Sequence, residues 1–285
     1  MKIARAILDG SAQFMAGRDG KNWAPLSRLG LQYSDTDEVI RNIESVTTRL
    51  DAATDLIPIA PEALMSPVVR PGKILAVGLN YIRHAEETGA VAPDRPLIFA
   101  KYTNSLHSPY GDVVIGAPIT EQADYEVELA VIIGREAKAV AEHEVDDYIF
   151  GYAVANDVSA RDWQRSDGQF SRSKSADTFC PIGPWITVAG DITSSSDLKL
   201  TSSVNGEPRQ TGSTREMVFG VASLISYLST TITLVPGDVI LTGTPPGVGL
   251  GFTPPRFLEP GDVVECSVEG LGVIRNRFVA SPSAP

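Results

Sequence analysis

The 285-residue sequence has few cysteines and histidines and no long apolar run. Its two cysteines, Cys180 and Cys266, cannot build a disulfide framework. No stretch approaches the roughly 18 uninterrupted apolar residues of a membrane-spanning helix, so no membrane association is expected. Charged residues interrupt the apolar residues of the first positions too early for a signal peptide, which predicts a cytoplasmic protein.

Positive charge is also scarce. The sequence has 24 Lys and Arg against 35 Asp and Glu, a formal net charge of −11. A surface of this sign repels a phosphate backbone, so nucleic acid is not an expected partner. With 43% hydrophobic and 21% charged residues, the composition is that of a globular protein. The length suits one large β-rich domain or two average ones.

The chain is expected to form a small N-terminal domain, a larger body and a disordered tail, at residues 1–65, 66–281 and 282–285. In the first domain the apolar spacing predicts one helix from about Asp37 to Ala52. The segment Ile57–Pro61 is predicted as a linker, because its two prolines exclude a helix and a central strand.

The larger body reads mainly as strands, so the predicted fold class is α+β with mostly β structure. The strongest strand candidates are the short apolar runs 73–78, 127–133 and 149–155, and the weaker ones are 112–115 and 185–188. Asn205-Gly206 predicts a type I′ hairpin. Ser213 and Glu216 form a capping box, which predicts one helix continuing to Leu228.

Acidic residues gather between positions 121 and 147, where nine acids face two bases. In a strand, Glu126 and Glu128 share one face, with their carboxylates about 7 Å apart along the chain. A solvated edge strand would account for them, but the apolar run that follows favours burial, and buried carboxylates need a cation or a proton. Oxygen ligands favour Mg²⁺ or Mn²⁺, with Ca²⁺ also possible. The other acids of the segment are interpreted as solvated surface.

Asp157 is the candidate third ligand, because it follows the apolar strand 149–155, and strand ends commonly carry sites. The alternative is that Asp157 caps a helix that begins just after it. His84 and Glu87 are three residues apart, so one helical turn would bring them together. They form either an imidazole oriented by a carboxylate for general-base catalysis or a surface pair.

The segment 161–174 reverses the sign of the charge, with four bases against two acids. Lys174 lies in a Ser-rich loop, where it either meets an anionic substrate or developing oxyanion or is a solvated lysine. The glycine-rich run 241–249 lacks the phosphate-loop and dinucleotide patterns, and a turn in which Thr244 grips a carboxylate fits it better. Cys180 is interpreted as a packed residue rather than a nucleophile.

In their order along the chain, these motifs resemble the fumarylacetoacetate hydrolase family. The resemblance covers roughly residues 68–279. It rests on five motifs, namely Gly78-Leu-Asn-Tyr-Ile-Arg-His84-Ala-Glu-Glu87, Asp124-Tyr-Glu126-Val-Glu128-Leu-Ala, Gly151-Tyr through Asn156-Asp157-Val-Ser-Ala-Arg161 to Gln164, Lys174 with Asp177 through Pro184, and Pro236-Gly-Asp through Thr244-Pro. It implies a mixed β-roll catalytic domain, preceded here by a small α/β domain, and a homodimer.

The resemblance also implies the functional residues. They are the metal ligands Glu126, Glu128 and Asp157, the catalytic dyad His84 and Glu87 on a lid, the catalytic Lys174, and the substrate-binding residues Gln164, Arg161 and Thr244.

The implied chemistry passes through a metal-bound enolate of a small anionic 2-oxo acid. The leading expectation is a hydrolase that cleaves a C–C bond in a 2,4-dioxo acid of the acylpyruvate or fumarylpyruvate type, with His84 activating water. An oxaloacetate-type decarboxylase or tautomerase and a 2-hydroxyhepta-2,4-diene-1,7-dioate-type isomerase use the same intermediate and stay open. From another class, an inactive metal-binding or carboxylate-binding protein stays open as well.

Overall fold

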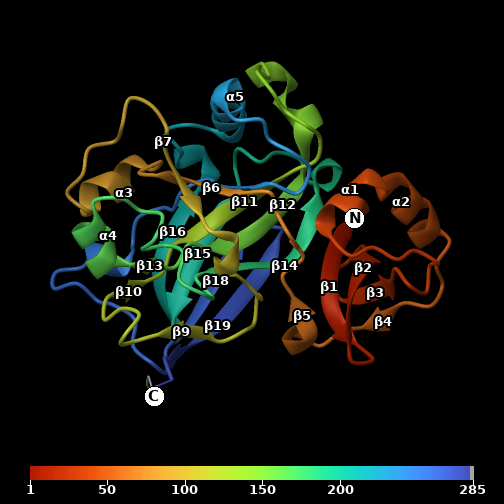
Figure 1. The fold of residues 1–285 in the computed structure, drawn as a ribbon, viewed down its shortest axis with the longest axis horizontal. Helices are drawn as coiled ribbons and strands as arrows, with labels where there is room; N and C mark the ends of the chain where they lie inside the picture. The colour runs from red at the N-terminus through yellow and green to blue at the C-terminus, as the bar shows by residue number, and fades with distance from the viewer. Residues whose placement is uncertain (283–285) are drawn as a thin grey trace.

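The computed structural model describes residues 1–282, and strands make up most of its regular structure (Figure 1). The fold is mostly β, as predicted. Of the predicted tail, residues 283–285 lie outside the described part of the chain.

The N-terminal strands and helices lie together on one side of the molecule, coloured red to orange in Figure 1. They are β1 (Lys2–Leu8), β2 (Ser11–Gly17), β3 (Asn22–Pro25), α1 (Thr36–Arg41), α2 (Ile43–Asp51) and β4 (Ile57–Pro58).

Two predictions in this region are wrong. The single helix over 37–52 is two helices, because Asn42 leaves the helical conformation and its side-chain amide donates to the Glu38 carbonyl, 2.8 Å away. The supposed linker contains β4, which pairs with β3 through Trp23. β4 lies at the edge of its sheet, where a proline is tolerated because one side of the strand makes no ladder bonds.

A twelve-stranded sheet runs through both halves of the chain in the order β4-β3-β2-β1-β14-β12-β11-β17-β6-β7, with β5 paired to β1 and β8 paired to β14. Its other strands are β5 (Leu64–Met65), β6 (Ile74–Gly78), β7 (Leu97–Lys101), β8 (Leu106–His107), β11 (Val127–Ile133), β12 (Ile149–Asn156), β14 (Cys180–Val188) and β17 (Val239–Leu241). Strand β1 joins the two parts by pairing Ile3 with Ile186 of β14. The sheet is continuous across residue 65. Whether residues 1–65 fold as a separate domain therefore stays a prediction.

A second, five-stranded sheet has the order β16-β15-β18-β19-β9. Its strands are β9 (Val113–Ile115), β15 (Lys199–Val204), β16 (Glu207–Ser213), β18 (Val263–Val268) and β19 (Gly272–Ala280), and a separate short pair joins β10 (Ala123–Asp124) to β13 (Ser159–Ala160). The predicted hairpin between β15 and β16 is confirmed, because Asn205 and Gly206 both take positive φ, 52° and 79°.

The remaining helical segments are short. They are α3 (Ile82–Glu87), α4 (Arg161–Asp167), α5 (Val221–Thr231) and the 3₁₀ turns η1 (Pro61–Ala63), η2 (Thr103–Ser105), η3 (Glu142–Tyr148), η4 (Ala189–Asp191), η5 (Thr214–Glu216) and η6 (Gly249–Gly251). The prediction of one helix starting at Ser213 is wrong. Ser213 caps η5 by accepting from the amide of Arg215, and Met217 returns to an extended conformation before α5 begins.

Strand β11 shows how the sequence builds the core. Val127, Leu129 and Val131 point into a cluster shared with β15, β18 and β19 of the second sheet. Ala130 and Ile132 point the opposite way, into a cluster shared with α1 and α2. Because both faces of the strand are covered, a charged side chain near this strand must find a partner inside the protein.

A candidate metal centre and catalytic dyad

Four strand ends meet at one end of the large sheet. β11 and β12 are antiparallel with Val127 opposite Asn156, and β17 is antiparallel to β11 but parallel to β6. The start of β11 therefore lies beside the ends of β12, β17 and β6. Residues just outside these strand ends are brought together although they are far apart in the sequence.

Three buried carboxylates converge there. Glu126, Glu128 and Asp157 each offer an oxygen, and these oxygens lie within 4.8 Å of one another. The Asp157 amide donates to the Glu126 carbonyl, 2.9 Å away, which fixes the end of β12 against the start of β11. The predicted convergence of these three residues is confirmed. Asp157 does not cap a helix, because α4 begins four residues later with Ala160 at its N-cap.

The donor set fits a divalent cation. Glu128 takes part in none of the ion pairs among residues 1–282, and it accepts one backbone bond, from the Gly243 amide at 2.8 Å. Burial, together with the negative charges of Asp157 and Glu126, raises the pKa of Glu128 well above its usual value. An acid held in this way needs a proton or a cation, and three carboxylates without nitrogen or sulfur ligands suit a hard ion.

Two lysines neutralise the other acids. Lys174 Nζ lies 2.5 Å from Glu126 Oε2 and 2.7 Å from Asp157 Oδ2. Lys101, the last residue of β7, contacts Asp157 Oδ1 at 2.7 Å, the Phe179 carbonyl at 3.1 Å and the Lys174 carbonyl. Burial alone would lower the pKa of Lys174, but Asp157 and Glu126 outweigh it and raise that pKa. Lys174 is therefore a buried, paired cation rather than a solvated loop lysine.

Arg161 binds two acids from the start of α4. Its Nε lies 2.9 Å from Asp124 Oδ2, and its Nη2 lies 2.6 Å from Glu126 Oε1. The second Asp124 oxygen accepts the amide of Gly249 at 2.7 Å. Burial would raise the pKa of Glu126, but the charges of Lys174 and Arg161 outweigh it and lower that pKa to about 2. The interpretation of Asp124 as a solvated surface acid is wrong, because it is fully buried in this network.

His84 and Glu87 form the predicted pair on α3. His84 Nδ1 lies 2.9 Å from Glu87 Oε1, and the other Glu87 oxygen accepts the Gly247 amide at 2.7 Å. The pair is not a surface pair, because His84 is buried. With Nδ1 bonded to a carboxylate, Nε2 is the ring nitrogen left to take up a proton.

His84 and two of the three carboxylates, Glu126 and Glu128, line the same cavity of about 260 Å³, which α3 and α4 border. Its lining includes His84, Glu126, Glu128, Arg161, Gln164, Lys174 and Thr244. The Thr244 hydroxyl is held between the Val127 carbonyl at 2.9 Å and the Gln210 side-chain amide at 2.7 Å. Eight of the nine functional residues expected from the sequence thus contact or line this site, and the ninth, Glu87, holds the imidazole.

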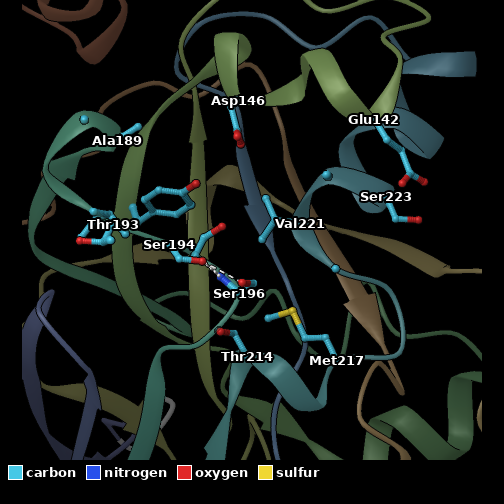
Figure 2. A pocket seen from close by; sticks show the side chains of 16 residues that line it. Glu142, Asp146, Ala189, Thr193, Ser194, Ser196, Thr214, Met217, Val221 and Ser223 are labelled. Atoms are coloured by element: carbon cyan, nitrogen blue, oxygen red, sulfur yellow. Dashed lines mark hydrogen bonds between the residues drawn. The ribbon is translucent and has the colours of Figure 1, made fainter.

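A larger cavity, about 660 Å³, lies elsewhere, between β12, η3, η5 and the start of α5. Figure 2 shows hydroxyl side chains such as Ser194, Ser196 and Thr214 around it, together with the carboxylates of Glu142 and Asp146. Its lining contains no lysine, arginine or histidine. The smaller cavity is therefore the better candidate for binding an anion.

Comparison with known proteins agrees with this geometry. Residues 73–279 match the family model described as the C-terminal domain of fumarylacetoacetate (FAA) hydrolase. The chain belongs to the fumarylacetoacetate hydrolase family. It is 44% identical over 231 residues to the mitochondrial oxaloacetate tautomerase Fahd2a of Rattus norvegicus, covering 81% of this chain and 74% of the relative. As a member of a family of hydrolases, isomerases and tautomerases, the protein is an enzyme.

Solved structures of family members have the same fold. The fumarylacetoacetate hydrolase of Exiguobacterium antarcticum is 35% identical, with a TM-score of 0.87, and the match covers 99% of this chain and 100% of that one. The maleylpyruvate hydrolase of Sphingobium sp. SYK-6, in complex with manganese (II) and pyruvate, is 30% identical with a TM-score of 0.83 and the same coverage. A family member thus holds a metal ion, and here the buried triad can bind one.

The rat relative is named as mitochondrial, whereas a cytoplasmic location is predicted here and stays a prediction. None of the helices within residues 1–282 has the length and apolar character needed to cross a membrane.

Sequence reasoning missed Lys101 and the role of Asp124. Lys101 ends the strand 97–101, where an isolated lysine after apolar residues gives no local pattern. Its partner Asp157 is 56 residues away. Asp124 precedes the Glu-x-Glu pair directly, and its place beside the start of a buried strand is the signal that could have found it.

Proposed function

We propose that the enzyme moves a proton between C3 and the 2-oxo oxygen of a 2-oxo dicarboxylic acid, the keto–enol tautomerisation of oxaloacetate. One observation carries the proposal: His84, which Glu87 orients, lines the same cavity as Glu126 and Glu128 of the carboxylate triad. The name of the 44% identical relative supports the same reaction.

Glu126, Glu128 and Asp157 would hold Mg²⁺ or Mn²⁺. When bound, the ion supplies a Lewis acid that makes the C3 hydrogens of a 2-oxo acid more acidic. A cavity of about 260 Å³ lies below the usual range of small-molecule sites, roughly 300–1,000 Å³, and so suits a short substrate.

His84 is the proton carrier in this proposal. Nε2 removes a proton from C3, the electron pair moves to the 2-oxo oxygen, and the imidazolium returns the proton to that oxygen to give the enol. Glu87 holds Nδ1–H in place and stabilises the imidazolium. Arg161 and Lys174 supply positive charge at the cavity wall, and Gln164, whose Oε1 accepts from Arg161 Nη1 at 2.9 Å, presents its amide nitrogen.

C–C hydrolysis of an acylpyruvate is the second candidate. The observation in its favour is the same orienting bond from Glu87 to His84 Nδ1, because it prepares Nε2 equally well to activate a water. The name of the maleylpyruvate hydrolase relative also supports it. Hydrolysis adds water across the bond between C3 and C4 and releases pyruvate. Tautomerisation converts the keto form into the enol and releases no pyruvate.

Two assays separate these reactions. The ultraviolet absorbance of enol oxaloacetate follows tautomerisation, and coupled detection of pyruvate follows acylpyruvate hydrolysis and oxaloacetate decarboxylation. With Mn²⁺ added to metal-stripped enzyme, we expect enol conversion to accelerate and EDTA to abolish the effect, while Glu126→Gln enzyme shows no metal effect. If the enzyme released pyruvate faster than it tautomerised oxaloacetate, its main reaction would be hydrolysis or decarboxylation and the proposed tautomerisation would be wrong. No acceleration of any of these reactions would refute the enzyme chemistry proposed.

A further inference from the structure

Among the cationic side chains that line the cavity, Arg165 is the one without an acidic partner within residues 1–282. The lining contains three cationic side chains, of Arg161, Arg165 and Lys174. Arg161 and Lys174 are buried and each binds two carboxylates. Arg165 forms none of the salt bridges found among residues 1–282, and its Nη2 contacts only the neutral side-chain oxygen of Gln122.

The helix α4 directs three of its polar side chains to this cavity. Arg161, Gln164 and Arg165 are spaced i, i+3 and i+4, so they share one face of the helix, and all three line the cavity. Arg161 lies at the buried end, beside the triad, whereas Arg165 is exposed. A substrate bound at the triad thus has a third cationic side chain available toward solvent.

Part of the cavity wall is apolar. Val77, Leu79, Phe99, Phe170 and Leu250 line it. Phe99 and Phe170 pack edge to face, with ring centroids 5.5 Å apart. A carboxylate entering this apolar section is not stabilised by it, whereas one that reaches Arg165 gains charge-assisted hydrogen bonds.

The neighbouring Arg172 makes the contrast clear. Its Nε and Nη2 donate to the two carboxylate oxygens of Asp167, at 2.6 and 2.7 Å. The guanidinium also stacks on Trp163, 4.1 Å from the ring centroid. It does not line the cavity. Of the arginines on this segment, Arg165 is the one whose donors stay available to a ligand.

We propose that Arg165 binds the second carboxylate of a 2-oxo dicarboxylic acid and so selects diacids over monoacids. The inference rests on the proposed function and assigns its substrate class to one residue. A guanidinium has five N–H donors, so the contact with Gln122 orients the group and still leaves a pair of donors for a carboxylate.

The test compares two four-carbon substrates. Oxaloacetate and 2-oxobutanoate differ by a carboxylate in place of a methyl group, and exchange of the C3 hydrogens for deuterium, followed by NMR, reports proton transfer on both. For Arg165→Gln we expect KM for oxaloacetate to rise about tenfold, and the preference for oxaloacetate over 2-oxobutanoate to fall by the same factor. Arg172→Gln is the matched control and should keep the wild-type preference.

Equal effects of Arg165→Gln on both substrates, or no effect on either, would overturn the proposal. Failure of the proposed function has a different signature: the wild-type enzyme exchanges neither substrate. The inference is then decided by calorimetric binding of oxaloacetate to metal-loaded protein. Weaker binding to Arg165→Gln than to Arg172→Gln supports the assignment, and equal binding overturns it.

Discussion

Lys174 Nζ lies 2.5 Å from Glu126 Oε2 and 2.7 Å from Asp157 Oδ2, so the lysine ammonium occupies oxygens that a metal ion would also use. A cation in the triad and the Lys174 ammonium therefore compete for the same two carboxylates. The structure makes Lys174 a counter-charge of the site as well as a candidate catalytic group.

Lys174→Met should separate metal binding from turnover. Removing the ammonium takes one cationic partner from each of two buried carboxylates, while Arg161 still pairs with Glu126 and Lys101 with Asp157. The loss destabilises the metal-free protein by up to about 3–5 kcal/mol and favours a replacing cation. We expect Mn²⁺ to bind at least as tightly as in wild type, and turnover to fall at least about 100-fold. Isothermal calorimetry measures the Mn²⁺ affinity, and the tautomerisation assay measures the turnover. Loss of Mn²⁺ binding would show that Lys174 supports the site rather than competing for it.

Lys101→Met should be costly to stability. The side chain is 2% exposed and neutralises Asp157 Oδ1 from the side opposite Lys174. Breaking a buried ion pair by removing one partner costs about 3–5 kcal/mol, since the remaining charge stays buried. Urea unfolding of metal-free protein measures the loss of free energy of unfolding. Lys138→Met is the control, because Lys138 is exposed and lies away from the cavity. A free energy of unfolding of Lys101→Met equal to that of wild type would contradict the role of Lys101 as the buried counter-charge of Asp157.

Gly251→Ala should impair the dyad without unfolding the protein. A Cβ at Gly251 would lie 2.6 Å from Glu87 Oε2, 2.8 Å from its Cδ and 3.0 Å from its Cγ, and all three atoms belong to one side chain rather than to backbone. The chain can therefore accept the methyl group by moving Glu87, which weakens its bond to His84. We predict a fall of about tenfold in kcat with a melting temperature close to wild type. Gly190→Ala, where a Cβ meets nothing within 4 Å, is the control. A large loss of melting temperature would assign Gly251 to folding instead.

The two cysteines should resist modification in the folded protein. Burial raises the pKa of Cys180 to about 12 and also raises that of Cys266, so at pH 8 both are protonated thiols without access to reagent. The thiolate fraction of Cys180 grows only as the pH approaches 12. Labelling with a disulfide reagent at pH 8 should be negligible in buffer and complete in urea. Rapid labelling of the folded protein would contradict the interpretation of Cys180 as packed and inert.

Local patterns predicted much of the strand structure and the acidic triad. The apolar run 127–133 predicts β11, and the position of its start beside the end of β12 explains why Glu126 and Asp157 meet. Helix ends were harder to predict. The interruption at Asn42 accompanies a side-chain bond to the Glu38 carbonyl, and η5 ends where Met217 forms a β-bridge with the distant Tyr81.

Single residues that act over long range gave no local signal. Lys101 reaches Asp157 across 56 residues, and the partners Arg161 and Asp124 are 37 residues apart. The spacing of apolar residues along the sequence does not predict such long-range ion pairs. The resemblance to the family implies that Arg161 contacts substrate, and this stays a prediction. The structure adds that its guanidinium binds two acids at the cavity wall. The homodimer stays a prediction, which light scattering after gel filtration checks.

The most direct test of the central claim is deuterium exchange at C3 of oxaloacetate by Mn²⁺-loaded wild-type and His84→Gln enzyme, with Mn²⁺ binding measured in parallel. The account predicts equal Mn²⁺ affinity and an exchange rate at least about 100-fold lower in His84→Gln, because the imidazole carries the proton. Undiminished exchange by His84→Gln enzyme that still binds Mn²⁺ would contradict it.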